Sequence, residues 1–294
     1  MLQKGIYSLL FVSVLLCSCS GDSGKNEAPV VDTTKLSTNS NELVNAQKIL
    51  YTLPSPVEAA ALMKISGAGF DRAYLNPASN VSKYSSNASR ALNLGVYGTD
   101  LIYANVFEQN QESAEYFKCA NTLATALGIS EAFGESTLKR LKANKDNHDS
   151  LLSIVAEASL SADSYFKENE RPAASAMVAA GGWVEGLYIA TRIANKTKNP
   201  DIIQRVADQK NSINNLISLV ESFGSELELT AVLSDLKEIK SEFDKLEVKK
   251  GPGAKGEKAE GVPTIGIQKS ITINADQLQA ISDKAEMIRN KIIK

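Results

Sequence analysis

Two carboxylic acids interrupt apolar segments with a helical pattern, and they are the residues of this sequence best placed to do chemistry. Asp100 lies between two tyrosines, three positions away on either side, so the three side chains share one helix face. Glu185 lies among small, aliphatic and aromatic residues and also has a tyrosine three positions after it. Burying a carboxylate is costly unless it is paired or hydrogen-bonded. Each acid therefore needs a partner that the fold must supply.

The two acids admit three interpretations. In the structural one, each carboxylate accepts a hydrogen bond from a tyrosine or a helix end and fixes a helix crossing. In the second, Asp100 and Glu185 meet in a small-ligand pocket whose aromatic wall comes from Tyr97, Trp183 and Tyr188. In the third, they act as acid and base in a carboxylate-dependent hydrolase. Helical spacing does not give the separation of the carboxylates, so all three stay open, with the structural role as the leading hypothesis.

Other reactive groups are few. One histidine and three cysteines exclude most zinc sites, Cys/His nucleophile pairs and Ser-His-Asp triads. His148 stands among aspartates where a helix is expected to begin, and a solvated capping position is favoured there over a metal ligand. The sequence has no P-loop, dinucleotide-binding, EF-hand or Gly-x-Ser-x-Gly motif. We therefore expect no metal, no cofactor and no enzymatic activity.

The first residues have the pattern of a bacterial lipoprotein signal. A short basic start precedes an apolar run at 6–16, which is shorter than the roughly twenty residues that a membrane span needs. Leu16-Cys17-Ser18-Cys19 then resembles a lipobox, with an aliphatic residue at −3 and a small one at −1. This resemblance implies cleavage before Cys19 and acylation of its sulfur, with palmitate among the acyl groups. A plain secretory signal cut nearby is the alternative.

Cysteine usage follows from that processing. Cys17 leaves with the signal and Cys19 carries lipid, so the mature chain keeps only Cys119 as a further thiol. No intramolecular disulfide is then expected, even in an oxidising compartment. Cys119 lies inside a strongly helical pattern and is expected to be a buried, unreactive thiol.

Composition divides the chain into a lipoprotein signal peptide at 1–18, a flexible polar tether at 19–40 and a helical domain at 41–294 with a mobile loop at 249–263. Lys and Arg nearly balance Asp and Glu, giving a formal net charge of −2, so no nucleic-acid partner is expected. We expect a protein of the cell envelope, most simply of the outer membrane, that is attached to the membrane through Cys19. Another envelope protein is the expected further partner.

The helical domain is predicted to be all-α: a multi-helix bundle of antiparallel helices, with a small β hairpin or arm before the C-terminal helix. Helix starts are marked by capping residues, by proline at the first helical position, or by both. These starts are Ser55-Pro56, Arg171-Pro172, Asn199-Pro200, Ser225 and Asn274. Alternating apolar residues at 264–267 and 271–273 predict the strands of the hairpin.

The stretch 81–127 is periodic but long for one helix, so two helices or one kinked helix are expected. Gly95 and Gly98 mark either the break or a close helix crossing. A duplication is a further hypothesis, because four residues of this stretch recur 86 positions later with identical spacing. Gly95, Tyr97, Leu101 and Ala104 correspond to Gly181, Trp183, Leu187 and Ala190.

Three segments carry a resemblance to a known group of proteins. They are Leu53-Pro54-Ser55-Pro56, the stretch from Leu92 to Leu101, and the stretch from Ala180 to Tyr188. With these, the chain resembles a group of all-helical Bacteroidota lipoproteins over most of its mature length. The resemblance implies a location and a lineage but no activity, so no catalytic residue is carried over.

These observations lead to a function hypothesis without a reaction. We expect a membrane-anchored helical lipoprotein of the bacterial cell envelope that acts as a non-enzymatic binding or scaffolding module. The alternatives are a small-ligand binding protein with a pocket near Asp100, Glu185 and Trp183, and a hydrolase that uses the same acids. Whether the two acids converge on one pocket decides among them.

Overall fold

The computed structural model describes residues 63–64, 67–130, 135–144, 147–223, 227–250 and 269–294. The chain divides into two units, 1–40 and 41–294, and every described residue belongs to the second. Apart from one small antiparallel sheet, the regular structure in these ranges is helical, which confirms the all-α class with a small β hairpin. The expected signal peptide, tether and lipidated Cys19 lie outside the described residues.

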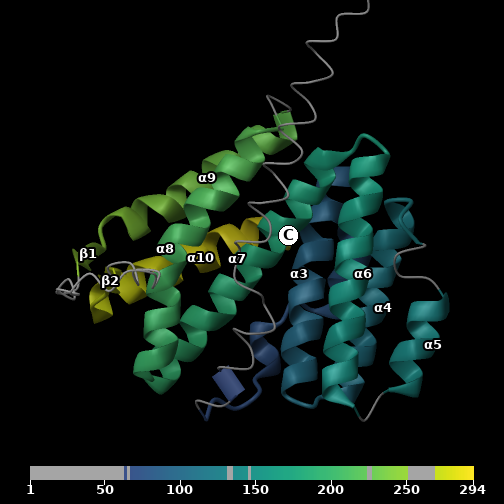
Figure 1. Ribbon diagram of the computed structural model, residues 1–294, viewed down its shortest axis with the longest axis horizontal. Helices are drawn as coiled ribbons and strands as arrows, with labels where there is room; N and C mark the ends of the chain where they lie inside the picture. The colour runs from purple at the N-terminus through teal and green to yellow at the C-terminus, as the bar shows by residue number, and fades with distance from the viewer. Residues whose placement is uncertain (1–62, 65–66, 131–134, 145–146, 224–226, 251–268) are drawn as a thin grey trace, which may run out of the picture. The chain divides into compact units, whose positions relative to one another are not determined.

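Long helices joined mostly by short loops make up the described part (Figure 1). They are α3 (Asn87–Val106), α4 (Asn110–Ala126), α6 (His148–Glu168), α7 (Pro172–Thr197), α8 (Pro200–Glu221), α9 (Leu227–Asp244) and α10 (Ala275–Ile292). The shorter elements are the 3-10 helices η1 (Arg72–Tyr74) and η2 (Ala78–Lys83), the helix α5 (Glu135–Ala143), and the strands β1 (Glu247–Lys250) and β2 (Lys269–Thr272).

Helix α7 lies at the centre of this arrangement. It contacts α3 and α6 on one side and α8 and α10 on the other (Figure 1). By length and composition it is the one helix of the described residues apolar enough to cross a membrane, with a mean hydropathy of 1.2. More than half of that apolar window is buried inside the protein, and it contains the buried Glu185. Both facts are typical of the core helix of a globular domain.

Helices α3 and α7 cross at a contact that only glycine permits. A Cβ on Gly95 would lie 2.0 Å from the carbonyl oxygen of Val178, and a Cβ on Gly181 would lie 2.0 Å from the carbonyl oxygen of Leu92. Each glycine therefore lies against the carbonyl three positions before the other glycine. Gly95, one of the two glycines expected to mark a break or a close crossing, is at a close crossing.

The two crossing helices run parallel, although helices consecutive in the chain return in the opposite sense. The hydroxyl of Thr99, four residues after Gly95, donates to the carbonyl of Gly182 and also lies beside Gly186, so the contacts advance in the same direction along both helices. Gly95 lies beside Val178 and Gly182, at offsets of 83 and 87 residues, which bracket the 86-residue spacing of the sequence correspondence. The contacts of Gly95 and Gly181 are thus reciprocal across the α3–α7 crossing.

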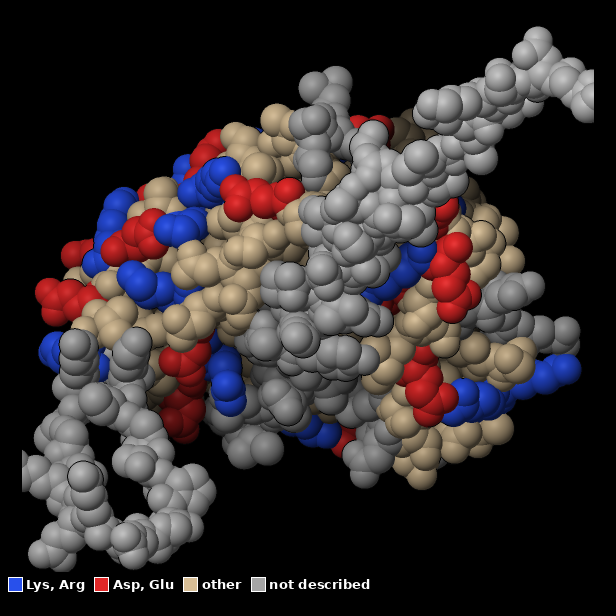
Figure 2. Space-filling model, turned by 45° about the horizontal axis from the view of Figure 1, so that its top comes forward, with Lys and Arg blue, Asp and Glu red and all other residues tan. Residues whose placement is uncertain are grey.

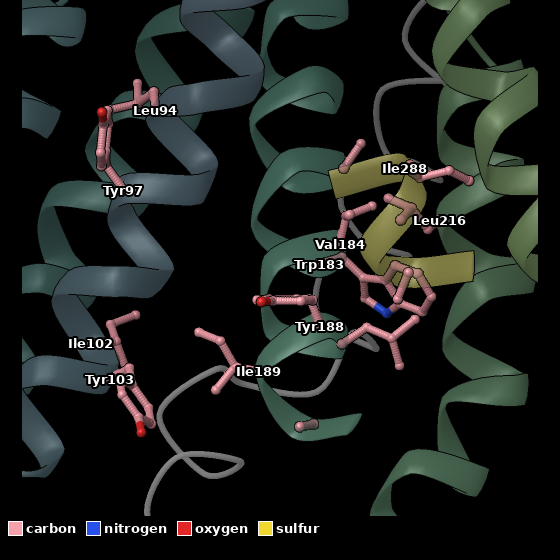
Figure 3. Packing of buried hydrophobic residues seen from close by; sticks show 14 of the residues in the cluster. Leu94, Tyr97, Ile102, Tyr103, Trp183, Val184, Tyr188, Ile189, Leu216 and Ile288 are labelled. Carbon is pink, nitrogen blue, oxygen red and sulfur yellow. The ribbon is translucent and has the colours of Figure 1, made fainter. Parts of the chain in front are cut away.

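Tyr97 and Trp183, which correspond to each other in the sequence, point to different neighbouring helices. Tyr97 points from α3 towards Tyr116 of α4, with ring centroids 6.0 Å apart. Trp183 points from α7 towards α8 and α9, where its indole N–H donates to Gln209 over 3.1 Å and its ring meets Phe243. The two residues therefore face away from each other, on opposite sides of the helix pair (Figure 3).

The capping pattern holds at the predicted starts of α8 and α10, whereas Arg171 before α7 makes no side-chain cap and only Pro172 marks that start. Asn199 accepts from the N–H groups of Asp201 and Ile202, and Asn274 forms a capping box with Gln277. The stretch 81–127 holds the end of η2 followed by two α-helices, α3 and α4. The break between these two falls at 107–109 and not at either glycine. The predicted starts at Ser55 and Ser225 lie outside the described residues.

The hairpin is built from a different pair of strands than the sequence suggested. β2 pairs antiparallel with β1, with Val248 opposite Ile271. Lys249 and Lys250 therefore belong to a strand and not to the expected loop, whose remainder lies outside the described residues, as does the expected strand at 264–267. Ile271 is buried, which holds the sheet against the helices and explains why the first strand needs few apolar residues of its own.

Candidate functional site

Glu185 forms a buried ion pair with Arg289 of α10. The guanidinium donates from Nε to Oε2 over 2.9 Å and from Nη2 to Oε1 over 3.0 Å, and Nη2 also donates to the carbonyl of Tyr74 over 3.1 Å. The Glu185 side chain has no exposed surface. This two-point geometry is the strongest that arginine and carboxylate can make. Burial opposes the charge of Arg289, but the adjacent carboxylate of Glu185 raises its pKa.

Asp100 reaches the same cluster from α3. It is completely buried, its Oδ2 accepts the backbone N–H of Asn76 over 3.1 Å, and its Oδ1 finds no hydrogen-bond donor among the described residues. Burial and the neighbouring Glu185 carboxylate raise the pKa of Asp100 well above its ordinary value, against the opposing pull of Arg289. Desolvation and a like charge both disfavour the ionised form. Both causes act against ionisation of the Asp100 carboxyl, which lies beside an ion pair.

The segment between η1 and α3 closes the cluster from outside. Asn76 is fully buried, and its side-chain amide donates to the hydroxyl of Tyr84 over 3.0 Å. That hydroxyl donates in turn to the carbonyl of Ile293 at the end of α10. Asn93 of α3 donates to the carbonyl of Ile292 over 2.9 Å. Hydrogen bonds thus join the last turn of α10 to α3 and to the segment before it.

The structure brings together four of the five residues that the sequence singled out. Asp100 and Glu185 meet, and the ring of Tyr188 lies 4.6 Å from the Arg289 guanidinium carbon, in cation–π contact. Tyr97 borders the cluster, and its hydroxyl donates to the carbonyl of Pro77. Trp183 does not join them, because it faces α8 and α9.

Arg289 is the residue that the sequence analysis missed. It lies four positions after Ala285, which lies four after Ile281, and all three are buried. An arginine that continues the apolar i, i+4 row of a helix is a signal for a buried carboxylate partner. Read together with Glu185, this position would have predicted the ion pair.

The carboxyl groups of Asp100 and Glu185 are not accessible to a substrate in the observed structure. Asp100 and Glu185 are both 0% exposed. Both carboxylate oxygens of Glu185 accept hydrogen bonds from Arg289. The convergence of the acids therefore gives a closed network that holds α3, α7, α10 and η1 together. This geometry favours the structural interpretation over the pocket and the hydrolase.

An open groove of about 300 Å³ lies on the neighbouring part of the molecule. Its walls come from the first turns of α3 and from α9, and α7 and α10 lie between them. The lining is mainly apolar, with Glu228, Asp235 and Lys291 as its charged residues, and Lys291 pairs with Asp235 over 2.7 Å. The uncharged lining residues are Ser86, Ala88, Ser89, Leu92, Ala180, Val184, Ala231, Val232, Leu236, Ile288 and Ile292.

Metal and thiol chemistry find no support in the described residues. No group of three or more His, Cys, Asp or Glu side chains lies close enough there to hold a metal ion. Cys119 is buried as expected, and burial raises the pKa of its thiol to about 11, which keeps it protonated and unreactive at neutral pH.

Comparisons with known proteins add no functional information. No protein-family model matches the sequence, and no curated protein and no solved structure matches it significantly. The functional argument therefore rests on the residues and geometry described above.

Proposed function

We propose that this protein is a membrane-anchored, non-enzymatic binding or scaffolding module of the bacterial cell envelope, attached through lipid on Cys19. One observation carries the non-enzymatic part. The only acids placed for catalysis by the sequence pattern are sealed in a closed ion network, whereas the open groove offers apolar surface. Attachment is supported by the lipobox-like Leu16-Cys17-Ser18-Cys19.

The groove is the binding surface in this proposal. Its partner is another envelope protein that inserts an apolar side chain flanked by a basic residue. The apolar part matches the floor that Val184 and Ile288 form. The basic part follows from charge, because Glu228 and Asp235 outnumber Lys291 at the groove and leave it a formal charge of −1. Buried apolar anchors with charged rims are the usual organisation of specific interfaces.

Site-specific photo-crosslinking in the native envelope tests this proposal. A photoreactive amino acid at Ala88, on the α3 wall, should give a discrete crosslinked product with one envelope protein. Glu228→Lys should abolish that product by reversing the rim charge. The matched control carries the photoreactive group at Leu160 of α6, which is 53% exposed and does not line the groove. Equal products from both positions, or a product that survives Glu228→Lys, would argue against the groove.

Attachment needs its own test. Cells fed an alkyne analogue of palmitate should label the wild-type protein, and Cys19→Ser should lose the label and leave the membrane fraction. Cys119→Ser is the matched control and should keep both, because Cys119 is a buried thiol. Labelling of the Cys19→Ser variant would contradict the proposed anchor.

The volume of the groove favours one second candidate. About 300 Å³ is at the lower limit of small-molecule pockets, so a small apolar ligand is the alternative occupant. The fluorescent probe 1-anilinonaphthalene-8-sulfonate should then bind the purified wild-type domain. The Ala231→Trp variant should lose this binding, because it places a large ring on the α9 wall. Absence of probe binding would leave the protein partner as the occupant.

A further inference from the structure

The ion network and the groove share two helices at adjacent positions. Glu185 follows Val184 on α7, and Arg289 follows Ile288 on α10, and both Val184 and Ile288 line the groove. The Glu185–Arg289 pair therefore fixes the distance between two helices on which the groove is built. Any change of charge in the cluster acts on α10 directly.

The cluster holds two carboxyls and one cation. Arg289 gives its Nε and Nη2 donors to Glu185 and to the carbonyl of Tyr74. From the part of the chain that the structure describes, Asp100 receives only the backbone N–H of Asn76. Two buried carboxylates beside one guanidinium cannot both carry charge without a large electrostatic cost. The Oδ1 atom of Asp100, which has no donor among the described residues, is where a proton resolves this conflict.

We infer that Asp100 holds a proton that it shares with Glu185, and that this proton acts as a latch that keeps α10 and residues 74–84 closed on α3 and α7. Loss of the proton places a second negative charge beside Glu185, competes for Arg289 and loosens the last turns of α10. The consequence for binding rests on the proposed function: an open latch widens the α10 side of the groove. The latch itself does not depend on what the groove binds.

Other ionisable groups that face Asp100 do not titrate at neutral pH. Burial raises the pKa of Tyr97, on the same helix, and that of Tyr116, on α4, well above the ordinary value for tyrosine. Burial also raises the pKa of the Cys119 thiol, on α4, to about 11. Arg289, from α10, and Glu185, from α7, face Asp100 as the ion pair. Asp100 is therefore the group in this cluster whose raised pKa makes it the candidate for a change of charge.

Amide hydrogen exchange of α10 measures the latch in the intact domain. The ratio of observed to intrinsic exchange rate gives the equilibrium constant for local opening. The open state releases one proton that the closed state holds, so this constant should rise about tenfold per pH unit, up to the pKa of Asp100. Asp100→Asn, which is neutral at every pH, should show no such rise. Glu157→Gln, which removes a surface carboxylate paired with Arg140, is the matched control and should behave as wild type.

A wild-type opening constant that does not change with pH, or one that changes equally in Asp100→Asn, would overturn the latch. Should the Asn variant not fold, infrared spectroscopy of the wild type at neutral pH decides the same question. The carbonyl stretch of a protonated, buried carboxyl is expected, and its absence would overturn the proposal. Photo-crosslinking from Ala88 at pH 6 and pH 9 is scored separately. If the opening constant of α10 depends on pH as expected but no crosslinked product forms at either pH, only the binding role of the groove is contradicted.

Discussion

The Asp100–Glu185–Arg289 cluster and the groove lie on the same helices yet differ in every property that decides function. The cluster contains the strongest ionic chemistry of the described residues, and solvent does not reach its two acids. The groove is open to solvent and mainly apolar, and two of its three charged residues are paired with each other. The ionisable groups of the cluster are therefore buried, while the accessible apolar surface lies in the groove. That separation is the observation on which the proposed binding role rests.

The buried charges of the cluster specify how the helices pack against one another. The Glu185–Arg289 pair and the hydrogen bonds of Asn76 and Asn93 connect helices that are far apart in the sequence. A buried ion pair adds little net stability compared with apolar residues, but it penalises any packing in which its partners do not meet. The cluster thus specifies how α10 lies on α3 and α7, and the groove is a consequence of that placement. The face shown in Figure 2 carries both charges side by side where its residues are described.

The largest effect should come from breaking the ion pair. Arg289→Met leaves the Glu185 carboxylate buried without its cation, and we expect a loss of about 3–5 kcal/mol in the free energy of unfolding. The double variant Glu185→Leu/Arg289→Met removes both charges and should recover most of that loss. Denaturant unfolding of the three proteins measures both effects. An Arg289→Met variant as stable as wild type would show that the pair does not hold the fold.

Crowding the α3–α7 crossing should cost somewhat less. A Cβ on Gly181 would lie 2.0 Å from a backbone oxygen that cannot rotate away, so Gly181→Ala should destabilise by about 3 kcal/mol, the upper range for overpacking. Gly98→Ala is the matched control on α3. Nothing lies within 4 Å of its Cβ position, and an alanine there should stabilise by about 0.5–1 kcal/mol through helix propensity. Thermal melting distinguishes the two, and equal effects would contradict the close crossing.

A smaller effect depends on pH. The folded protein holds a proton on Asp100 that the unfolded chain, with a pKa of about 3.9, has released, so this group lowers stability as pH rises above about 4. The slope reaches about 1.4 kcal/mol per pH unit until the folded pKa is passed. Asp100→Asn removes this dependence, so its stability relative to wild type should increase with pH. Melting temperatures from pH 5 to 9 measure the difference, and parallel curves would exclude a neutral Asp100.

Filling the groove should change stability least. Ala231 is an exposed residue on the α9 wall, and Ala231→Trp should alter the free energy of unfolding by no more than about 0.5 kcal/mol. The same variant should lose the crosslinked product from Ala88, because the indole occupies the space of the partner. A crosslinked product of wild-type yield would show that binding occurs elsewhere.

Sequence pattern predicted the fold class and part of the site. Capping residues located the starts of α8 and α10, and the recurrence of Gly95 and Gly181 after 86 residues turned out to be the register of the central helix crossing. Asp100 and Glu185 stood out because carboxylates are costly in apolar helices. Their meeting could not be predicted, because it depends on the parallel register of α3 and α7, which spacing along one helix does not contain.

Two features were accessible in the sequence but were read incorrectly or not at all. Trp183 and Glu185 are two positions apart, which places them about 200° apart around a helix, so they could not line one pocket. Arg289 continues the buried row of Ile281 and Ala285 and is the natural partner of a buried acid. The pairing of β1 with β2 was inaccessible, because the Lys-rich segment 247–250 has no apolar alternation and is held in place by its partner strand.

One measurement tests the separation of ionic cluster and binding surface most directly. The yield of the crosslinked product from Ala88 is compared at pH 7 between Asp100→Asn and Ala231→Trp, each on the otherwise wild-type chain. Our account predicts a yield near wild type for Asp100→Asn, because asparagine reproduces the neutral acid, and loss of the product for Ala231→Trp. The reverse outcome, a product lost with Asp100→Asn and kept with Ala231→Trp, would place function at the buried acids and contradict the account.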